Sequence, residues 1–227
     1  AISTIAIKSH NTARLLLPYE STQQKLQVFH NLKWEPFLWL IILAAGFAAI
    51  VLARKIKPQN ILQPDTENND KNTQTTQEST PLGKYLNIFI SVAGAGIISY
   101  FCLKILAQGI KFTDSRLGPV VGQPSTAQIF FAVIISFGVA SFAIKKFLNV
   151  NYLWAIAAIP LVSFLTIQTY AKPDFINILN ENWPVYFFHN PILAILPVQM
   201  VGLGALGAII GYWFAIKFDY WHKNELS

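Results

Sequence analysis

The side chains that most often take part in chemistry are few in this sequence and lie far apart. Its four histidines all fall outside the long apolar runs. Haem held between helices commonly needs histidines within those helices, so this pattern disfavours an integral haem site. Scattered histidines are also more often surface residues than zinc ligands, and no metal site is predicted. The histidines are His10, His30, His189 and His222.

No stretch has the spacing of a catalytic motif. HExxH, GxSxG and the Walker A pattern are absent, so zinc hydrolysis, acyl transfer at a nucleophile elbow and nucleotide hydrolysis lack their parts. Asp174, Glu181 and His189 share one connection and offer the weakest hypothesis, a membrane enzyme. Four serines lie in apolar runs with no histidine or lysine base at similar depth, which favours helix packing: Ser99, Ser136, Ser141 and Ser163.

Composition indicates which elements must position these residues. Hydrophobic residues make up 53% of the 227 residues and charged residues only 12%, whereas an ordinary soluble domain has about a quarter charged residues. The only cysteine, Cys102, lies in an apolar run and cannot form an intrachain disulfide. The net charge of +6 is spread along the ends of the runs, where lipid headgroups are natural counter-ions, so no nucleic-acid binding is predicted.

Five apolar runs approach the roughly 20 residues that a helix needs to cross a bilayer. None contains Asp or Glu, and their only basic residues, Lys104 and Lys217, lie near run ends. Coupled ion carriers usually need an ionisable group at bilayer depth, which is absent. We therefore predict an all-α integral membrane protein with about five transmembrane helices and short interfacial amphipathic helices. The runs are residues 36–53, 85–106, 127–144, 152–170 and 192–218.

The segments outside the runs differ in kind. Residues 59–80 have too few apolar side chains to offset chain entropy, which predicts a flexible linker. Ser21 and Gln24 fit a capping box that opens a short amphipathic helix, and Asp174 fits a helix start in a second interfacial segment. The expected organisation is an N-terminal extramembrane segment (1–35), a first transmembrane helix (36–58), the linker (59–83), a four-helix region (84–218) and a tail (219–227).

Basic residues near the run ends predict an orientation. The end of the first run, the connection between the third and fourth runs, and the end of the fifth run are basic, which is typical of cytoplasmic ends. The connection 171–191 has Lys172 as its only basic residue, which suits the side of the membrane opposite to the cytoplasm. The N-terminus is therefore expected outside and the C-terminus in the cytoplasm. The basic residues in question are Arg54, Lys55, Lys57, Lys145, Lys146, Lys217 and Lys223.

Small residues share one face of the last run, within about 100° of one another on a helix. In lipid, helices associate through close backbone approach and van der Waals packing, so this face is predicted to dock on another helix. Gly202 falls about 160° from Gly204, and a substitution there is expected to meet lipid or a looser neighbour. The predicted packing faces comprise Gly204, Gly207, Ala208 and Gly211 in the last run, Ser91, Ala95 and Ser99 in the second, and Ala45 and Ala49 in the first.

These features favour a non-catalytic accessory or scaffold subunit of a larger integral membrane complex. Its expected partners are other integral membrane subunits and lipids. No cofactor is predicted, and a bound lipid or pigment remains open. The alternative is a permease or substrate-binding component for a small, mostly uncharged molecule, with Gln128, Gln168 and Gln199 lining its path.

Overall fold

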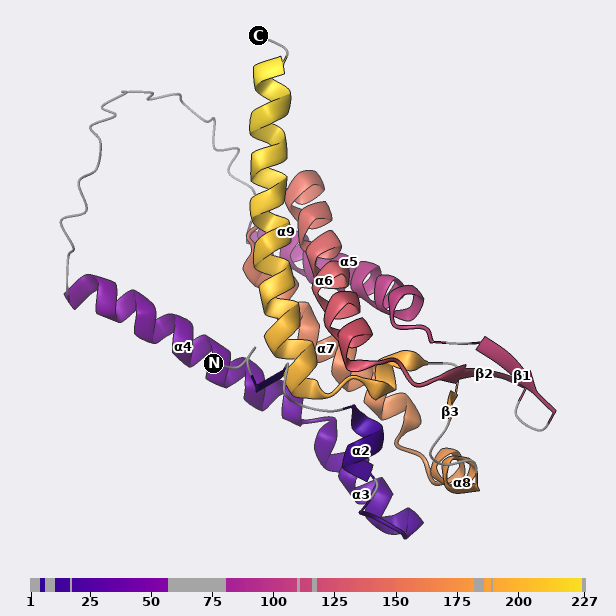
Figure 1. Ribbon diagram of the computed structural model, residues 1–227. Helices are drawn as coiled ribbons and strands as arrows, with labels where there is room; N and C mark the ends of the chain where they lie inside the picture. The colour runs from indigo at the N-terminus through magenta and orange to yellow at the C-terminus, as the bar shows by residue number, and fades with distance from the viewer. Residues whose placement is uncertain are drawn as a thin grey trace.

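The computed structural model describes residues 5–6, 11–16, 18–56, 81–109, 111–115, 118–181, 186–188 and 190–225 (Figure 1). Helices account for most of them. In chain order these are α2 (Thr12–Leu16), α3 (Thr22–Leu32), α4 (Glu35–Ile56), α5 (Pro81–Leu106), α6 (Thr126–Leu148), α7 (Tyr152–Tyr170), α8 (Pro173–Glu181), the 3-10 helix η1 (Pro191–Ala194) and α9 (Pro197–Glu225).

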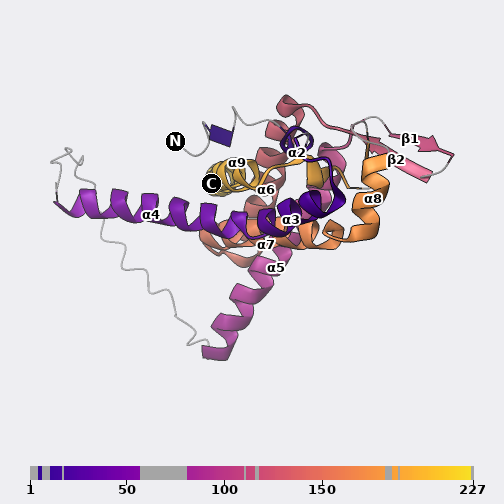
Figure 2. The ribbon, with the colours of Figure 1, turned by 90° about the horizontal axis from the view of Figure 1, so that it is seen from below.

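Four long helices form the body of the molecule. α6 and α9 run alongside each other, α5 packs on α6 and α7, and α7 packs on α9 (Figure 1). The apolar core between them includes Phe137 of α6, Ile159 of α7 and Leu203 of α9. α4 differs, because its side chains on this core, such as Trp39 and Leu40, come from its first half. Seen from below, α4 and α5 leave the bundle in different directions (Figure 2).

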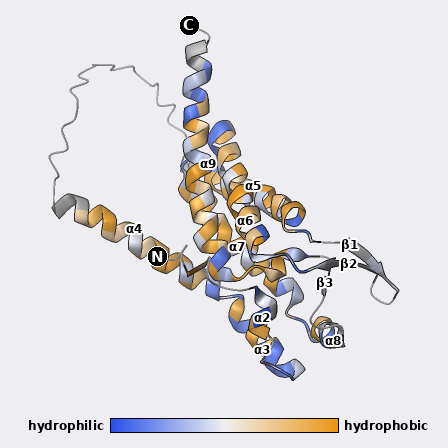
Figure 3. Ribbon diagram, in the orientation of Figure 1, coloured by the Kyte–Doolittle hydropathy of each residue, from blue (hydrophilic) through white to orange (hydrophobic). Residues whose placement is uncertain are grey.

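Five helices in the described residues are long and apolar enough to cross a membrane. Many of their large apolar side chains are exposed, and the hydropathy colouring shows that hydrophobic residues predominate along these helices (Figure 3). Ile41 is 64% exposed, Phe89 70% and Leu165 63%. Soluble proteins rarely expose large contiguous apolar patches, so helices with so many exposed large apolar side chains suit a hydrocarbon environment. The predicted mostly helical architecture, with five helices of spanning length, is confirmed.

A small antiparallel sheet corrects the all-α prediction in the connections. The strands are ordered β1 (Lys111–Asp114), β2 (Gly118–Gly122) and β3 (Tyr186–Phe188). Val120 of β2 pairs with Phe112 of β1 and with Phe188 of β3. Strands of three to five residues are too short for alternating polarity to stand out in a sequence, and β3 joins from a distant segment.

Several helix boundaries also differ from the expected ones. α5 begins at Pro81, so the last residues of the expected linker are helical, whereas residues 57–80 lie outside the described residues. α9 continues to Glu225 and takes in most of the expected tail. The fifth apolar run is divided, because η1 occupies its start and α9 begins only at Pro197. Proline lacks a backbone N–H and has a fixed φ, so it suits the first position of a helix.

The short elements α2, α3, α8, η1 and the sheet gather at one end of the bundle, and we call them the cap (Figure 1). The predicted capping box is confirmed: the Ser21 hydroxyl accepts from the Gln24 backbone N–H at 3.2 Å, and the Gln24 side chain accepts from the Ser21 backbone N–H at 3.5 Å. Phe29 of α3 is fully buried and packs with Ile176 of α8 and Leu193 of η1 in a second, smaller core.

Polar side chains also join α3 to α8. Thr22 Oγ1 donates to Asn177 Oδ1 at 3.0 Å, and Asn180 Nδ2 donates to Thr22 Oγ1 at 2.9 Å. Lys25 Nζ donates to Asn180 Oδ1 as well. The cap therefore binds the N-terminal segment to the connection between α7 and α9.

Two introduced cysteines test the path of the chain. Asp174 lies in the cap and His222 near the end of α9, and both are exposed. In a Cys102→Ala background, Asp174→Cys and His222→Cys are expected to react with a membrane-impermeant thiol reagent from opposite sides of sealed vesicles, because one crossing separates them. Reaction of both from the same side would contradict the five-helix path.

Candidate functional site

Two helices approach each other closely where α9 packs on α6, at three glycines. A Cβ added to Gly207 would overlap the carbonyl oxygen of Ile134, and one added to Gly211 would overlap the backbone of Gly138. A Cβ on Gly138 would in turn lie 3.4 Å from the carbonyl oxygen of Gly207. We call Gly138, Gly207 and Gly211 the glycine crossing. The small-residue face of α9 thus docks on a helix of the same chain.

The other residues expected on that face of α9 are also buried. Ala208 has no exposed surface, and a Cβ on Gly204 would lie 2.9 Å from Cδ2 of Phe137. For Gly202, the expected contact with lipid is wrong, because Gly202 is buried. The first turns of α9 lie next to the cap, so other elements cover every side of the helix there.

The two remaining small-residue faces differ in burial: the face of α5 is buried and the face of α4 is exposed. Ser91, Ala95 and Ser99 have no exposed surface and line the inner face of α5. The two serine hydroxyls donate within their own helix, to the carbonyls of Asn87 at 2.7 Å and Gly96 at 3.1 Å. Ala45 and Ala49 of α4 are exposed instead, and a Cβ on the neighbouring Gly46 would meet nothing within 4 Å. The described residues therefore leave the face of α4 uncovered.

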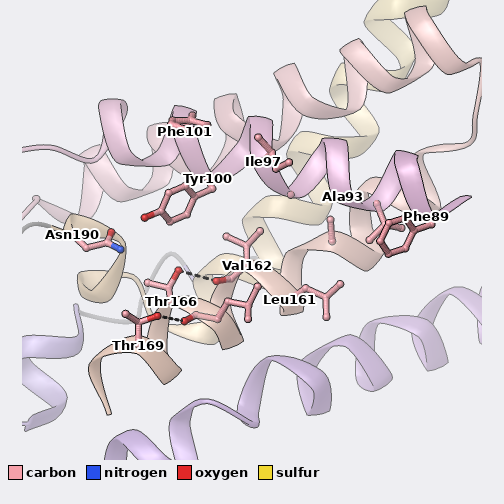
Figure 4. Close-up of a pocket in the computed structure, with 14 residues that line it drawn as sticks. Phe89, Ala93, Ile97, Tyr100, Phe101, Leu161, Val162, Thr166, Thr169 and Asn190 are labelled. Carbon is pink, nitrogen blue, oxygen red and sulfur yellow. Dashed lines mark hydrogen bonds between the residues drawn. The ribbon is translucent and has the colours of Figure 1, made fainter. Parts of the chain in front are cut away.

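A groove of about 650 Å³ lies between α5 and α7 (Figure 4). Among the described residues that line it, none is Asp, Glu, Lys, Arg or His, and most are apolar. We call it the α5–α7 groove. It is lined by Phe89, Val92, Ala93, Gly96, Ile97, Tyr100, Phe101, Ala158, Leu161, Val162, Leu165, Thr166, Thr169 and Asn190.

The polar groups of the groove gather at its cap end (Figure 4). Thr166 and Thr169 each donate a hydroxyl to the carbonyl four residues earlier, both at 2.8 Å. Asn190 is buried and its Oδ1 accepts from the Ile192 backbone N–H at 3.1 Å. The Tyr100 ring lies between these groups and the apolar part, with its hydroxyl toward the cap end (Figure 4). No periodicity in the sequence marks these residues, because two helices and a connection supply them.

The three glutamines of the permease hypothesis do not meet, and none of them lines the α5–α7 groove. Gln128 Nε2 donates to the carbonyls of Leu106 at 3.1 Å and Gln108 at 2.6 Å, where α5 ends. Gln168 Oε1 accepts from Lys33 Nζ at 2.9 Å. The third, the buried Gln199, accepts from the Leu196 backbone N–H at 3.0 Å and donates to the Ala6 carbonyl at 3.4 Å. Each glutamine thus stabilises a contact at the end of a helix or between two segments of the chain.

The candidate enzyme residues are placed only in part. Asp174 is exposed on the first turn of α8, Glu181 is the last residue of that helix, and His189 lies outside the described residues. No group of three or more His, Cys, Asp or Glu side chains among the described residues could hold a metal ion.

The described chain is thus a bundle containing five helices of membrane-spanning length, with a mixed helix and sheet cap at one end. Comparison of the sequence and structure with protein-family models, curated proteins and solved structures finds no match.

Alanine substitutions test the glycine crossing. Alanine is the better helix former by about 1 kcal/mol, so Gly46→Ala, with open space at its Cβ, is expected to leave stability unchanged or raised. Gly207→Ala and Gly211→Ala would instead push two backbones apart, and they are expected to lower stability by about 1–3 kcal/mol. Thermal unfolding in detergent measures the difference. Equal unfolding temperatures for all three variants would contradict the close contact.

Proposed function

We propose that this chain is a multi-pass membrane protein that serves as a non-catalytic accessory or scaffold subunit of a larger integral membrane complex. The observation that carries this proposal is the exposure of α4. In the most apolar window of the first candidate span, 6% of the residues are buried, compared with 44–50% in the spans of α6, α7 and α9.

The composition of α4 supports a protein partner over lipid alone. Its middle reads AAGFAA, with Ala45, Gly46 and Ala49 exposed. A helix that faces only lipid gains nothing from small side chains, whereas close approach of a second helix requires them. We therefore assign this face to a transmembrane helix of another subunit.

The chemistry of the described residues supports a non-catalytic role. Gln128 and Gln199 bond to backbone groups, and Gln168 bonds to Lys33. Ser91 and Ser99 donate within α5, whereas the hydroxyls of Ser136 and Ser141 are buried with no hydrogen-bond partner among the described residues. The lining of the α5–α7 groove is mostly apolar. A permease for a small, mostly uncharged molecule is expected to have a cavity lined by Gln128, Gln168 and Gln199, and none of the three lines the α5–α7 groove. The permease alternative therefore has less support.

The orientation belongs to the same proposal. The last turn of α6, with Lys145 and Lys146, lies at the end of the bundle away from the cap (Figure 1). Cytoplasmic ends of transmembrane helices are enriched in such residues. We therefore place the cap outside and the end of α9 in the cytoplasm, so that Asp174→Cys is the variant labelled from outside.

Two alanines of α4 form a matched test of the partner. Ala49 lies on the small-residue face, and Ala44 is equally exposed but about 140° around the helix. Ala49→Leu is expected to lower recovery of a stoichiometric membrane partner about tenfold or more, because leucine separates the two helices. Ala44→Leu is expected to leave recovery unchanged. The measurement is native mass spectrometry of tagged protein extracted from its native host in mild detergent.

Two outcomes would contradict the proposal. One is a wild-type chain that is recovered without a stoichiometric partner. The other is equal partner recovery for Ala49→Leu and Ala44→Leu, which would show that the small-residue face of α4 makes no specific contact.

A further inference from the structure

We infer that the α5–α7 groove binds one lipid-like molecule with an uncharged, oxygen-bearing head and a flexible apolar tail. A volume of about 650 Å³ falls in the range of about 300–1,000 Å³ that is usual for small-ligand sites. The inference rests on the proposed membrane insertion and is independent of the proposed protein partner.

The two ends of the groove differ in the way that an amphiphile requires. Phe89, Ala93 and Leu161 form one end, and Tyr100 and Asn190 lie at the other (Figure 4). The apolar end suits a hydrocarbon tail, since burial of the tail against these side chains costs no hydrogen bonds. The polar end points toward the cap, where the membrane surface is expected.

The polar end carries side chains that can donate hydrogen bonds. The threonine hydroxyls already donate to backbone carbonyls, and Asn190 Oδ1 accepts from Ile192. The Tyr100 hydroxyl points to this end (Figure 4), close to Tyr170, whose hydroxyl is hydrogen-bonded with the Asn190 side chain. A carbonyl or hydroxyl oxygen of a ligand can accept from Tyr100 Oη. A charged head would find no counter-ion in the described lining, and its desolvation would be uncompensated.

The groove is long enough for one acyl chain. Phe89 and Tyr100 are eleven residues apart on α5, which is about 16 Å at a rise of about 1.5 Å per residue. One acyl layer of a hydrocarbon core of about 30 Å is about 15 Å thick. A lipid with its head at Tyr100 would therefore reach the far end of the groove with its tail.

Small residues create the space. A Cβ on Gly96 would lie 3.7 Å from Cγ2 of Val162, so any larger side chain there must extend into the groove. Gly94 lies on the same helix outside the lining, and its Cβ would meet nothing within 4 Å. These two glycines provide a matched pair, in which one leucine fills the groove and the other enters open space.

Photolabelling tests the inference on purified protein in phosphatidylcholine nanodiscs. The probe is a diacylglycerol with a diazirine on one acyl chain, and labelled residues are located by mass spectrometry. Saturable labelling of α5 and α7 at the groove is expected, with competition by unlabelled diacylglycerol. Gly96→Leu should lower it about tenfold, and Gly94→Leu should leave it unchanged. Tyr100→Phe should lower it about fivefold, for the loss of one hydrogen bond, whereas the exposed Tyr85→Phe should not.

Several results would overturn the inference. Even labelling around α5, or equal labelling of Gly96→Leu and Gly94→Leu, would show ordinary surrounding lipid. Equally strong labelling by a phosphatidic acid probe would contradict the preference for an uncharged head. Equally strong labelling by a hydrocarbon probe without a head group would contradict the role of Tyr100. Unfolding temperatures of the same samples show whether each variant is folded. Resistance of the wild-type protein to carbonate extraction tests insertion separately, so a failure of the groove and a failure of the membrane proposal are distinguishable.

Discussion

Close backbone contact at the glycine crossing is the constraint on which the rest of the bundle depends. Where Gly207 and Gly211 meet α6, the position of a side chain is already occupied by backbone of Ile134 and Gly138. That contact fixes the separation of α6 and α9, since neither backbone can yield to a larger residue. α7 packs on α9 and α5 packs on α6, so the spacing of α5 and α7 follows from it.

The same residue types have three different roles in this chain. Gly207 lets two helices touch, Gly96 leaves the space of the α5–α7 groove, and Ala49 lies exposed on α4. Each role follows from what lies opposite the small side chain, whether backbone, cavity or open surface. A small residue inside an apolar helix therefore indicates that another group can come close to the helix backbone at that position. The surrounding structure determines whether that group is a helix of the same chain, a ligand or another protein.

The glutamine side chains inside the bundle form hydrogen bonds near the ends of helices. Gln128 holds the end of α5, Gln199 holds the start of α9, and Lys33 reaches Gln168 from the cap. Unpaired polar groups are costly in an apolar surrounding, so backbone carbonyls and N–H groups freed at helix ends attract such side chains. This use of the glutamines leaves the α5–α7 groove apolar along most of its length and supports the inference of a lipid-like occupant.

The five apolar helices, the small-residue face of α9 and the capping box at Ser21 could be predicted from the sequence, because hydropathy, helical spacing and local hydrogen bonding are properties of neighbouring residues. The contact of Gly207 with α6 of the same chain, the exposure of Ala49, and the groove shared by Tyr100 and Asn190 could not be predicted in this way. The three-stranded sheet could not be predicted either, since β3 pairs with β2 from a remote segment. Such contacts depend on which distant surfaces fit together, and no local pattern in the chain records that fit.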